Sequence, residues 1–288
     1  MAILDVLIPT HRRKTALATT LTGLFGQTRK DFDVIVSDQS EGESPLESPE
    51  LVTLARAFRL RGQRVRYLKH LPRRGLAEHR HFLLEQARAP YVLYVDDDLL
   101  LEPWVVEHML STIQAEGCGF VGMAVSGLQH VNDVRPHEQH IELWEGRVRP
   151  ERYTFETAPM NRHKLHNAGN PLHLSWRFAG NRIVRYKVAW VGACALYDRE
   201  KLLDCGGYSW WTELPAEHAG EDVLVQMLVA NRYGGCGILP SGVYHLELPT
   251  EVPNRETNTN ALLIRYLDQL RDESPDDEAQ AVPRRKAA

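Results

Sequence analysis

Hydrophobic and polar positions along the first 125 residues follow two alternating patterns. Short apolar or β-branched runs predict strands, and between them apolar residues recur at the spacing of one helix face. We expect strands at residues 3–8, 33–37, 65–68 and 91–95, and helices at 14–27, 51–60, 76–87 and 103–116. Such strand–helix alternation predicts a largely parallel sheet with helices on both of its faces.

The pattern changes after residue 125. Residues 126–187 show no clean period, and we expect an irregular excursion with short strands that belongs to the same domain. Order then returns, with predicted strands at 188–197, 237–239 and 242–245, and helices at 199–205, 221–232 and 257–270. We therefore predict one domain over residues 1–270, and a polar, proline-containing disordered tail over residues 271–288.

Composition excludes several classes of protein. The chain has 288 residues, of which 43% are hydrophobic, enough for a sizeable core and too many for a disordered chain. Its formal net charge of −4 gives no support to nucleic-acid binding, which favours a strongly basic domain. Its four cysteines include no CxxC pair, which is typical of buried thiols in the reducing cytosol. No apolar run approaches the ~20 residues of a membrane span, so we expect a cytoplasmic protein without a transmembrane segment, and peripheral membrane contact stays open.

An apolar strand runs directly into three carboxylates in the segment YVLYVDDDLLLEP, residues 91–103. Ligands of open α/β sheets bind beyond the carboxyl ends of the strands. Asp96 and Asp98 can point the same way from an extended segment, and two clustered carboxylates repel each other unless a cation lies between them. Mn²⁺ or Mg²⁺ suits such oxygen ligands and also suits a diphosphate. The alternative is a solvated acidic turn that caps the following helix.

Five segments together resemble the family 2 glycosyltransferases of the GT-A fold. They are VLIPTHRRKTALATTLTGLFGQT, VIVSDQSEG, RRGLAEHRHFLLEQARAPYVLYVDDDLLLEP, VGACALYDREKLLDCGGY and AGEDVLVQMLVANRYG, and they cover about residues 3–125 and 188–246 in the family's order. The resemblance implies a three-layer α/β/α fold with a mostly parallel central sheet. It also implies a nucleotide-sugar-binding half at 1–125 and an acceptor-side half at 188–270, with the excursion on the acceptor side.

The resemblance implies roles for residues on the donor side. Pro9 and Thr10 fall in the loop after the first strand, against the nucleotide, and Asp38 falls where a carboxylate accepts a hydrogen bond from uracil or guanine. Gly75 and Arg80 fall in a loop-to-helix segment near the diphosphate or base. Taken alone, Asp38 is also typical of a turn and Arg80 of a surface charge.

The same resemblance assigns the acidic run and a distant histidine to the cation. It implies that Asp98 binds the divalent metal, Mn²⁺ or Mg²⁺, directly, and that Asp96 and Asp97 lie near the ribose, with Asp96 as an additional metal contact. His245 ends a short predicted strand, where some GT-A enzymes have a further metal ligand. A strand-end histidine that only makes a hydrogen bond is the alternative.

On the acceptor side the resemblance points to a helix start and an aromatic pair. Asp222 corresponds to the general base and Glu221 lies beside it, although acidic residues at a helix start also act as plain caps. We expect the helix dipole to keep Asp222 ionised near neutral pH. Trp210 and Trp211 resemble an acceptor-lining loop, and core packing is their alternative role.

The resemblance therefore implies a metal-dependent, inverting glycosyltransferase that uses a nucleoside-diphosphate sugar, UDP-linked first and GDP-linked second. The resemblance also bears on processivity, because processive polysaccharide synthases of the family have a Gln-x-x-Arg-Trp motif that is missing here after residue 222. We therefore expect one sugar to be transferred per encounter, to the hydroxyl of a glycan, a lipid-linked acceptor or a small molecule. The alternative function is a catalytically silent binding module for nucleotide sugars or glycans. Dinucleotide-dependent oxidoreductases and P-loop enzymes are disfavoured because PTHRRKTA after the first strand contains no glycine.

Overall fold

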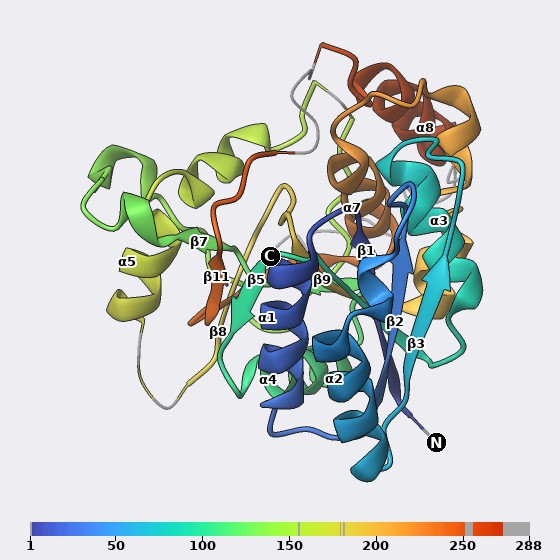
Figure 1. Ribbon diagram of the computed structural model, residues 1–288. Helices are drawn as coiled ribbons and strands as arrows, with labels where there is room; N and C mark the ends of the chain where they lie inside the picture. The colour runs from blue at the N-terminus through green and yellow to red at the C-terminus, as the bar shows by residue number, and fades with distance from the viewer. Residues whose placement is uncertain (1, 155, 179, 181, 251–255, 273–288) are drawn as a thin grey trace, which may run out of the picture.

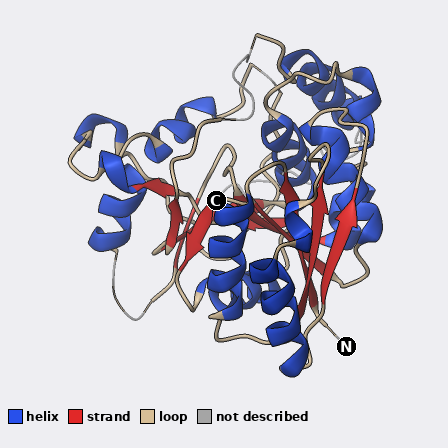
Figure 2. Cartoon of the chain, in the orientation of Figure 1, coloured by secondary structure: helices blue, strands red, loops and turns tan. Residues whose placement is uncertain are grey.

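The computed structural model describes residues 2–154, 156–178, 180, 182–250 and 256–272. Within them the main sheet has eight strands in the order β3-β2-β1-β4-β9-β6-β10-β8, and a small sheet has the order β5-β11-β7. Helices cover both faces of the main sheet (Figures 1 and 2).

The first half of the main sheet is parallel. β1 (Leu4–Thr10) pairs with β2 (Phe32–Asp38) and β4 (Tyr91–Val95), and β3 (Val65–Lys69) pairs with β2. All seven residues of β1 are buried. The pairing with β4 ends at Leu7, and β1 continues against β2 alone through Pro9 and Thr10. Proline is tolerated where one side of a strand lacks a partner, so β1 includes two residues that we expected in the following loop.

The second half brings in strands of the opposite direction. β9 (Cys194–Asp198) runs antiparallel between β4 and β6 (Phe120–Gly122), while β10 (Gly235–Leu239) is parallel to β6. At the far edge, β8 (Val184–Tyr186) is antiparallel to β10. Because only β9 and β8 oppose the others, the prediction of a mostly parallel α/β sheet is confirmed.

Alternation along the strands divides the core into two layers. Val6 and Ile8 belong to the layer that contains α1 (Lys14–Phe25), α2 (Pro49–Leu60) and α4 (Val105–Glu116). Leu7 belongs to the opposite layer. That second layer contains α3 (Leu76–Gln86), α6 (Arg199–Asp204), α7 (Glu221–Tyr233) and α8 (Asn260–Asp272). Successive side chains of a buried strand point to opposite faces, and this gives the three-layer arrangement.

The expected strand at 188–197 begins only at Cys194. Residues 188–193 approach it as a buried loop, whose backbone at Val191 is hydrogen-bonded by the buried Gln226 side chain of α7. The Val191 N–H donates to Gln226 Oε1 and Gln226 Nε2 donates to the Val191 carbonyl, both at 2.7 Å. An apolar run can therefore be buried without a strand partner when a side chain satisfies its peptide groups.

The excursion at 126–187 contains more structure than its sequence predicts. Besides the short strands β7 (Ser126–Gly127) and β8, it holds α5 (Asn170–Arg177) and 3₁₀ helices at Leu128–His130, Pro136–Glu138 and Met160–His166. Two more 3₁₀ helices lie at Pro45–Glu47 and Ser209–Glu213. The predicted tail falls almost wholly outside the described residues, since α8 extends to Asp272.

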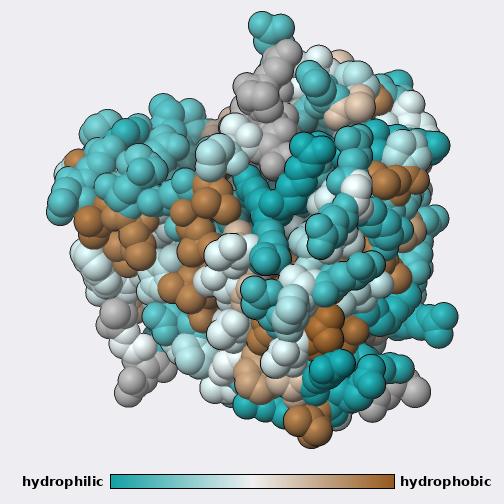
Figure 3. All heavy atoms as spheres, in the orientation of Figure 1, coloured by the Kyte–Doolittle hydropathy of each residue, from teal (hydrophilic) through white to brown (hydrophobic). Residues whose placement is uncertain are grey.

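Internal ion pairs use much of the charge of the excursion. Arg162 forms a bridge to Glu142 and Glu151, and Lys187 reaches both carboxylates at 3.7 Å. On the face seen in Figure 3, hydrophobic side chains reach the surface in separate groups between polar ones. None of the helices in the described ranges has the length and apolar character needed to cross a bilayer.

Candidate functional site

The carboxyl ends of β1 and β4 meet around the acidic run that follows β4. Thr10 ends β1, and its hydroxyl donates a hydrogen bond to Asp97 Oδ2 at 2.6 Å. The Asp96 N–H donates to the Ala193 carbonyl in the loop before β9. The run is therefore fixed from both halves of the sheet, at the edge where α/β proteins bind ligands.

A short antiparallel pair brings His245 to this run. β5 (Leu99–Leu101) pairs with β11 (Val243–His245), with His245 opposite Leu99, and the Leu246 N–H donates to the Asp98 carbonyl at 2.9 Å. His245 Nε2 then lies 3.4 Å from Asp98 Oδ2. The structure thus places the histidine predicted from a strand end beside the aspartate predicted to bind metal.

An arginine side chain also contacts the carboxylates of the acidic run. Arg13 Nη1 lies 2.7 Å from Asp98 Oδ2 and 3.2 Å from Asp97 Oδ1, and its Nη2 donates to the Pro249 carbonyl. Arg13 was not predicted as a site residue. Its sequence signal was a cationic run, HRRK, after the first strand, but only the fold shows which of these cations faces the carboxylates.

A second group of charged side chains surrounds Arg80, and it shares the acidic run with the first. Arg80, whose side chain is only 2% exposed, lies 3.2 Å from Asp96, 3.4 Å from Asp222 and 3.6 Å from Glu221. Its guanidinium carbon is 5.5 Å from the centre of the Tyr94 ring, whose hydroxyl donates to the Arg80 carbonyl. Arg80 therefore holds three carboxylates together, which contradicts its alternative role as a surface charge, and its contact with the diphosphate or base stays a prediction.

Burial alters the ionisation of these carboxylates. Desolvation raises the pKa of Asp222, assisted by Glu221 and Asp96 and opposed by Arg80. Loss of water thus opposes the effect of the helix dipole at Asp222, and ionisation of this carboxylate near neutral pH stays a prediction. Desolvation likewise raises the pKa of Asp96, and it raises the pKa of Asp97 to about 7.

Asp38 lies at the end of β2 with its carboxylate fully buried. One oxygen accepts from the Ser40 N–H at 2.8 Å and from the Ser40 hydroxyl, and the other accepts from Ser44 Oγ at 2.8 Å and Lys69 Nζ at 2.9 Å. Burial alone would raise the pKa of Asp38, but these hydrogen bonds together lower it. A nucleotide base would have to displace one of these donors, so contact between Asp38 and the base stays a prediction.

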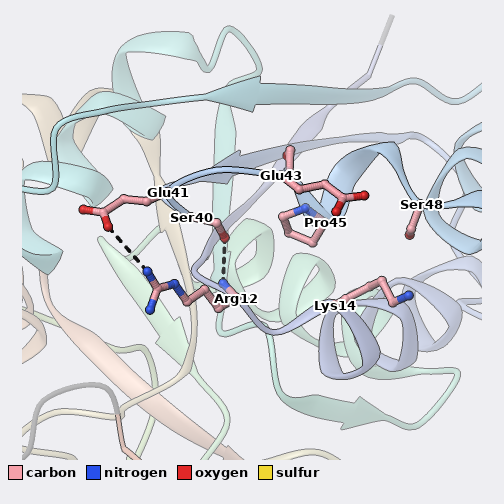
Figure 4. A pocket seen from close by; sticks show the side chains of 8 residues that line it. Arg12, Lys14, Ser40, Glu41, Glu43, Pro45 and Ser48 are labelled. Carbon is pink, nitrogen blue, oxygen red and sulfur yellow. Dashed lines mark hydrogen bonds and ion pairs between the residues drawn. The ribbon is translucent and has the colours of Figure 1, made fainter.

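A cavity of about 310 Å³ opens beside Ser40 (Figure 4). Ser40 and Ser44 belong both to its wall and to the hydrogen bonds of Asp38. The remaining lining residues are Arg12, Lys14, Glu41, Glu43, Pro45 and Ser48. The cavity is therefore lined mostly by polar residues, all from the half of the chain, residues 1–125, that is predicted to bind the nucleotide sugar.

Gly75 precedes α3 with φ +104° and ψ 168°, a conformation reserved almost entirely for glycine. A Cβ atom there would lie 2.5 Å from His218 Cε1. His218 Nε2 accepts a hydrogen bond from the Ala77 N–H at 3.2 Å, and its Nδ1 faces the Pro215 carbonyl at 2.8 Å. His218 thus joins the start of α3 to the loop before α7, and a lone histidine in the sequence gives no signal of this contact.

The two residues of the predicted aromatic pair, Trp210 and Trp211, differ in their exposure to solvent. Trp210 is 2% exposed in the core and its indole N–H donates to the Gly207 carbonyl, so the prediction that its face is available to a sugar is wrong. Trp211 is partly exposed, and the Arg74 guanidinium lies 6.0 Å from its ring centre. Trp211 alone stays a candidate for acceptor contact.

The donor atoms suit a divalent cation that arrives with phosphate. Among the described residues no group of three or more His, Cys, Asp or Glu side chains is arranged around a metal position. Asp98 and His245 form a pair at 3.4 Å, whereas Asp96 Oδ1 accepts a hydrogen bond from Arg80. Mg²⁺ is commonly held by one or two carboxylates with water and substrate phosphates, so the Asp98–His245 pair fits a cation bound in that way.

Comparison with known proteins identifies the family of this chain. Residues 5–192 match the family model described as Glycosyl transferase family 2. A protein of Bacillus subtilis (strain 168) named EpsH, provisionally described as a glycosyltransferase, is 27% identical over 158 residues. The alignment covers 50% of this chain and 44% of EpsH, so the chain spans under half the length of that relative.

Solved structures share the fold at low sequence identity. S. aureus TarS 1-349 has a TM-score of 0.55 at 16% identity, covering 85% of this chain and 60% of that chain. The same TarS piece in complex with UDP-GlcNAc gives 0.53 at 17% identity, with 88% and 60% covered. The mannosyltransferase PcManGT from Pyrobaculum calidifontis, in complex with GDP-Man and Mn²⁺, gives 0.53 at 14% identity, with 87% and 58% covered. The family model matches well over half of this chain, and the solved structures share its architecture. The chain therefore belongs to glycosyl transferase family 2 and has the GT-A fold.

Proposed function

We propose that this protein transfers a sugar from a nucleoside-diphosphate sugar to an acceptor hydroxyl, one sugar per encounter and with inversion at the anomeric carbon. The observation that carries the proposal is the junction of two charged groups at one sheet edge. Asp96 contacts the buried Arg80–Asp222 group, and Asp98, two residues on, contacts His245. A donor site at Asp98 and an acceptor-activating carboxylate at Asp222 would then lie at the two sides of one short acidic run, residues 96–98.

Asp98 and His245 are the residues that would hold a divalent cation, Mn²⁺ or Mg²⁺. When bound, such a cation neutralises negative charge on the leaving diphosphate. Thr10 fixes Asp97 beside it, and the cavity next to Ser40 lies where the nucleoside would be expected. The known neighbours bind UDP-GlcNAc and GDP-Man, which supports UDP as our first donor nucleotide and GDP as our second.

Asp222 would accept the proton of the acceptor hydroxyl as the sugar is attacked from the opposite side. Its carboxylate sits in the first turn of α7, and Arg80 holds it in place at 3.4 Å. A pKa raised by burial suits a general base, because proton uptake is most effective when the pKa lies near the working pH. Glu221, 3.6 Å from Arg80, would position this group, and Trp211 would contact a glycan, lipid-linked or small-molecule acceptor. We place the reaction in the cytoplasm.

The test is incubation with a panel of UDP- and GDP-sugars and candidate acceptors, followed by release of nucleoside diphosphate and mass spectrometry of products. We expect release with one donor, loss of turnover in excess EDTA, and recovery with Mn²⁺ or Mg²⁺. Asp98→Ala should abolish turnover, whereas the control Asp31→Ala, at an exposed pair with Arg29, should not. The anomeric configuration of the product, measured by NMR, tests inversion.

Two outcomes would contradict the proposal. Full turnover in excess EDTA would contradict metal dependence. Binding of a nucleotide sugar with no release of nucleoside diphosphate under any condition would support a silent binding module instead.

A further inference from the structure

Arg13 is held as an internal counter-ion of the acidic run. Its side chain is 16% exposed, and its two partners Asp97 and Asp98 are almost fully buried. Thr10 occupies the other oxygen of Asp97, so the guanidinium meets a carboxylate pair that is already fixed in position. Such an enclosed ion pair differs from the loose pairs of a protein surface.

The neighbouring arginine shows the contrast. Arg12 pairs with Glu41 at 3.4 Å, and both side chains are mostly exposed. It lies on the wall of the cavity beside Ser40, and within the described part of the chain its guanidinium pairs with Glu41 and not with Asp97 or Asp98. Arg12 and Arg13 are therefore neighbours in the sequence, but the charge of Arg12 lies at the surface and that of Arg13 is enclosed.

Arg13 and a metal ion would compete for the same oxygen, Asp98 Oδ2. This one oxygen lies 2.7 Å from Arg13 Nη1 and 3.4 Å from His245 Nε2. A divalent cation between Asp98 and His245 would lie against the guanidinium, and like charges at such a distance in a water-poor site repel strongly. Negative charge from a diphosphate would relieve this repulsion, and a guanidinium is well suited to bind phosphate oxygens.

We propose that Arg13 occupies the cation position of the acidic run until a divalent metal arrives together with a diphosphate, and that it then binds the diphosphate. The inference rests on the proposed function and gives it an order of binding. The protein binds the metal ion weakly by itself and much more tightly in the presence of a nucleoside diphosphate.

The experiment measures Mn²⁺ binding to the whole protein, without sugar donor, from the electron paramagnetic resonance signal of free Mn²⁺. In Arg13→Gln we expect Mn²⁺ alone to bind at least about tenfold more tightly than in the wild type, because the competing charge is removed. Arg12→Gln removes the same charge one residue away and, with Mn²⁺ alone and no nucleotide present, should bind Mn²⁺ as the wild type does. Adding Asp98→Asn to Arg13→Gln should abolish the gained binding, which locates it.

Addition of UDP completes the test. UDP should tighten Mn²⁺ binding in the wild type by a larger factor than in Arg13→Gln. Arg13→Lys, which keeps a charge on a shorter-reaching group, should bind Mn²⁺ alone with an affinity between those of the wild type and Arg13→Gln, and melting temperatures report whether each variant folds.

Equal Mn²⁺ affinities in the wild type and Arg13→Gln, or no binding to either, would overturn the inference, as would the same gain in Arg12→Gln. These results are independent of sugar transfer. A gain in Arg13→Gln with no turnover of any nucleotide sugar would contradict the proposed function and leave the role of Arg13 supported.

Discussion

Asp222 is a carboxylate whose chemistry depends on the groups around it. Asp222→Asn keeps its shape and removes its basicity, so we expect transfer to fall by at least about two orders of magnitude, the usual contribution of a general base. Nucleotide affinity and melting temperature should change little. Turnover and nucleotide binding are measured on the same preparations, with Glu221→Gln as the milder comparison. Near-normal turnover in Asp222→Asn would assign the base elsewhere, and a large loss of stability would indicate a capping role.

Arg80 supplies a buried positive charge that contacts three carboxylates, of which Glu221 is nearly buried and Asp96 and Asp222 are partly exposed. Arg80→Met leaves these carboxylates without their partner, and we expect the free energy of unfolding to fall by about 3–5 kcal/mol. Urea unfolding measures this loss. Arg59→Met, at an exposed position of α2, is the matched control and should change stability little. Unfolding curves that coincide for the two variants would show that Arg80 makes no net contribution.

At the scale of elements, α3 depends on the turn that precedes it. Ala at position 75 adopts a backbone conformation that costs about 1–3 kcal/mol, and its Cβ overlaps His218. We expect Gly75→Ala to lower the melting temperature and also turnover, because displacement of His218 shifts the helix that carries Arg80.

Gly62→Ala is the control for this change. Gly62 also has a positive φ, at +79°, but nothing lies within 4 Å of its added Cβ. Gly62→Ala should lower the melting temperature only through the strained backbone conformation, and it should keep full turnover. Equal losses of turnover in the two variants would show that His218 contact is not what matters at position 75.

The elements also show where sequence patterns suffice. Tyr91–Val95 is predicted with its observed bounds because a short, wholly apolar run between turns has few other structures available. The run at 188–193 is apolar as well, but it forms a loop, in which the peptide groups of Val191 are satisfied by the Gln226 side chain of α7. The predicted site residues come together because the order of motifs indicates the fold. The contacts of Arg13 with Asp98 and of Arg80 with Asp222 join residues 85 and 142 positions apart, and no local pattern contains them.

At the scale of the whole molecule, a buried histidine ties stability to pH. His79 is 3% exposed, and burial, His70 and Arg80 lower its pKa to about 3, whereas the Ser37 carbonyl and Asp38 act in the opposite direction. The unfolded chain binds a proton at this histidine below about pH 6.5 and the folded chain does not. Its contribution to stability is therefore lost as the pH falls from about 6.5 towards 3, by up to about 1.4 kcal/mol per pH unit.

Comparison of variants isolates this effect, because the raised pKa values of Asp97 and Asp222 give the opposite slope. We expect urea unfolding of His79→Gln at pH 7 and pH 5 to show a smaller acid loss than the wild type. His81→Gln, on the same helix and 28% exposed, should keep the wild-type slope. Identical slopes in all three proteins would contradict a neutral buried His79.

The position of β9 has a consequence for synthesis on the ribosome. β9 is the strand that joins β4 to β6, yet its residues, Cys194–Asp198, are made after both. A nascent chain that has reached residue 193 therefore presents open backbone edges on β4 and β6, and such edges pair readily with other chains. Slow translation before residue 194 would lengthen this exposed interval, whereas rapid delivery of β9 joins β4 to β6. The order of strands thus leaves the two parts of the sheet unjoined until a late segment of the chain has been made.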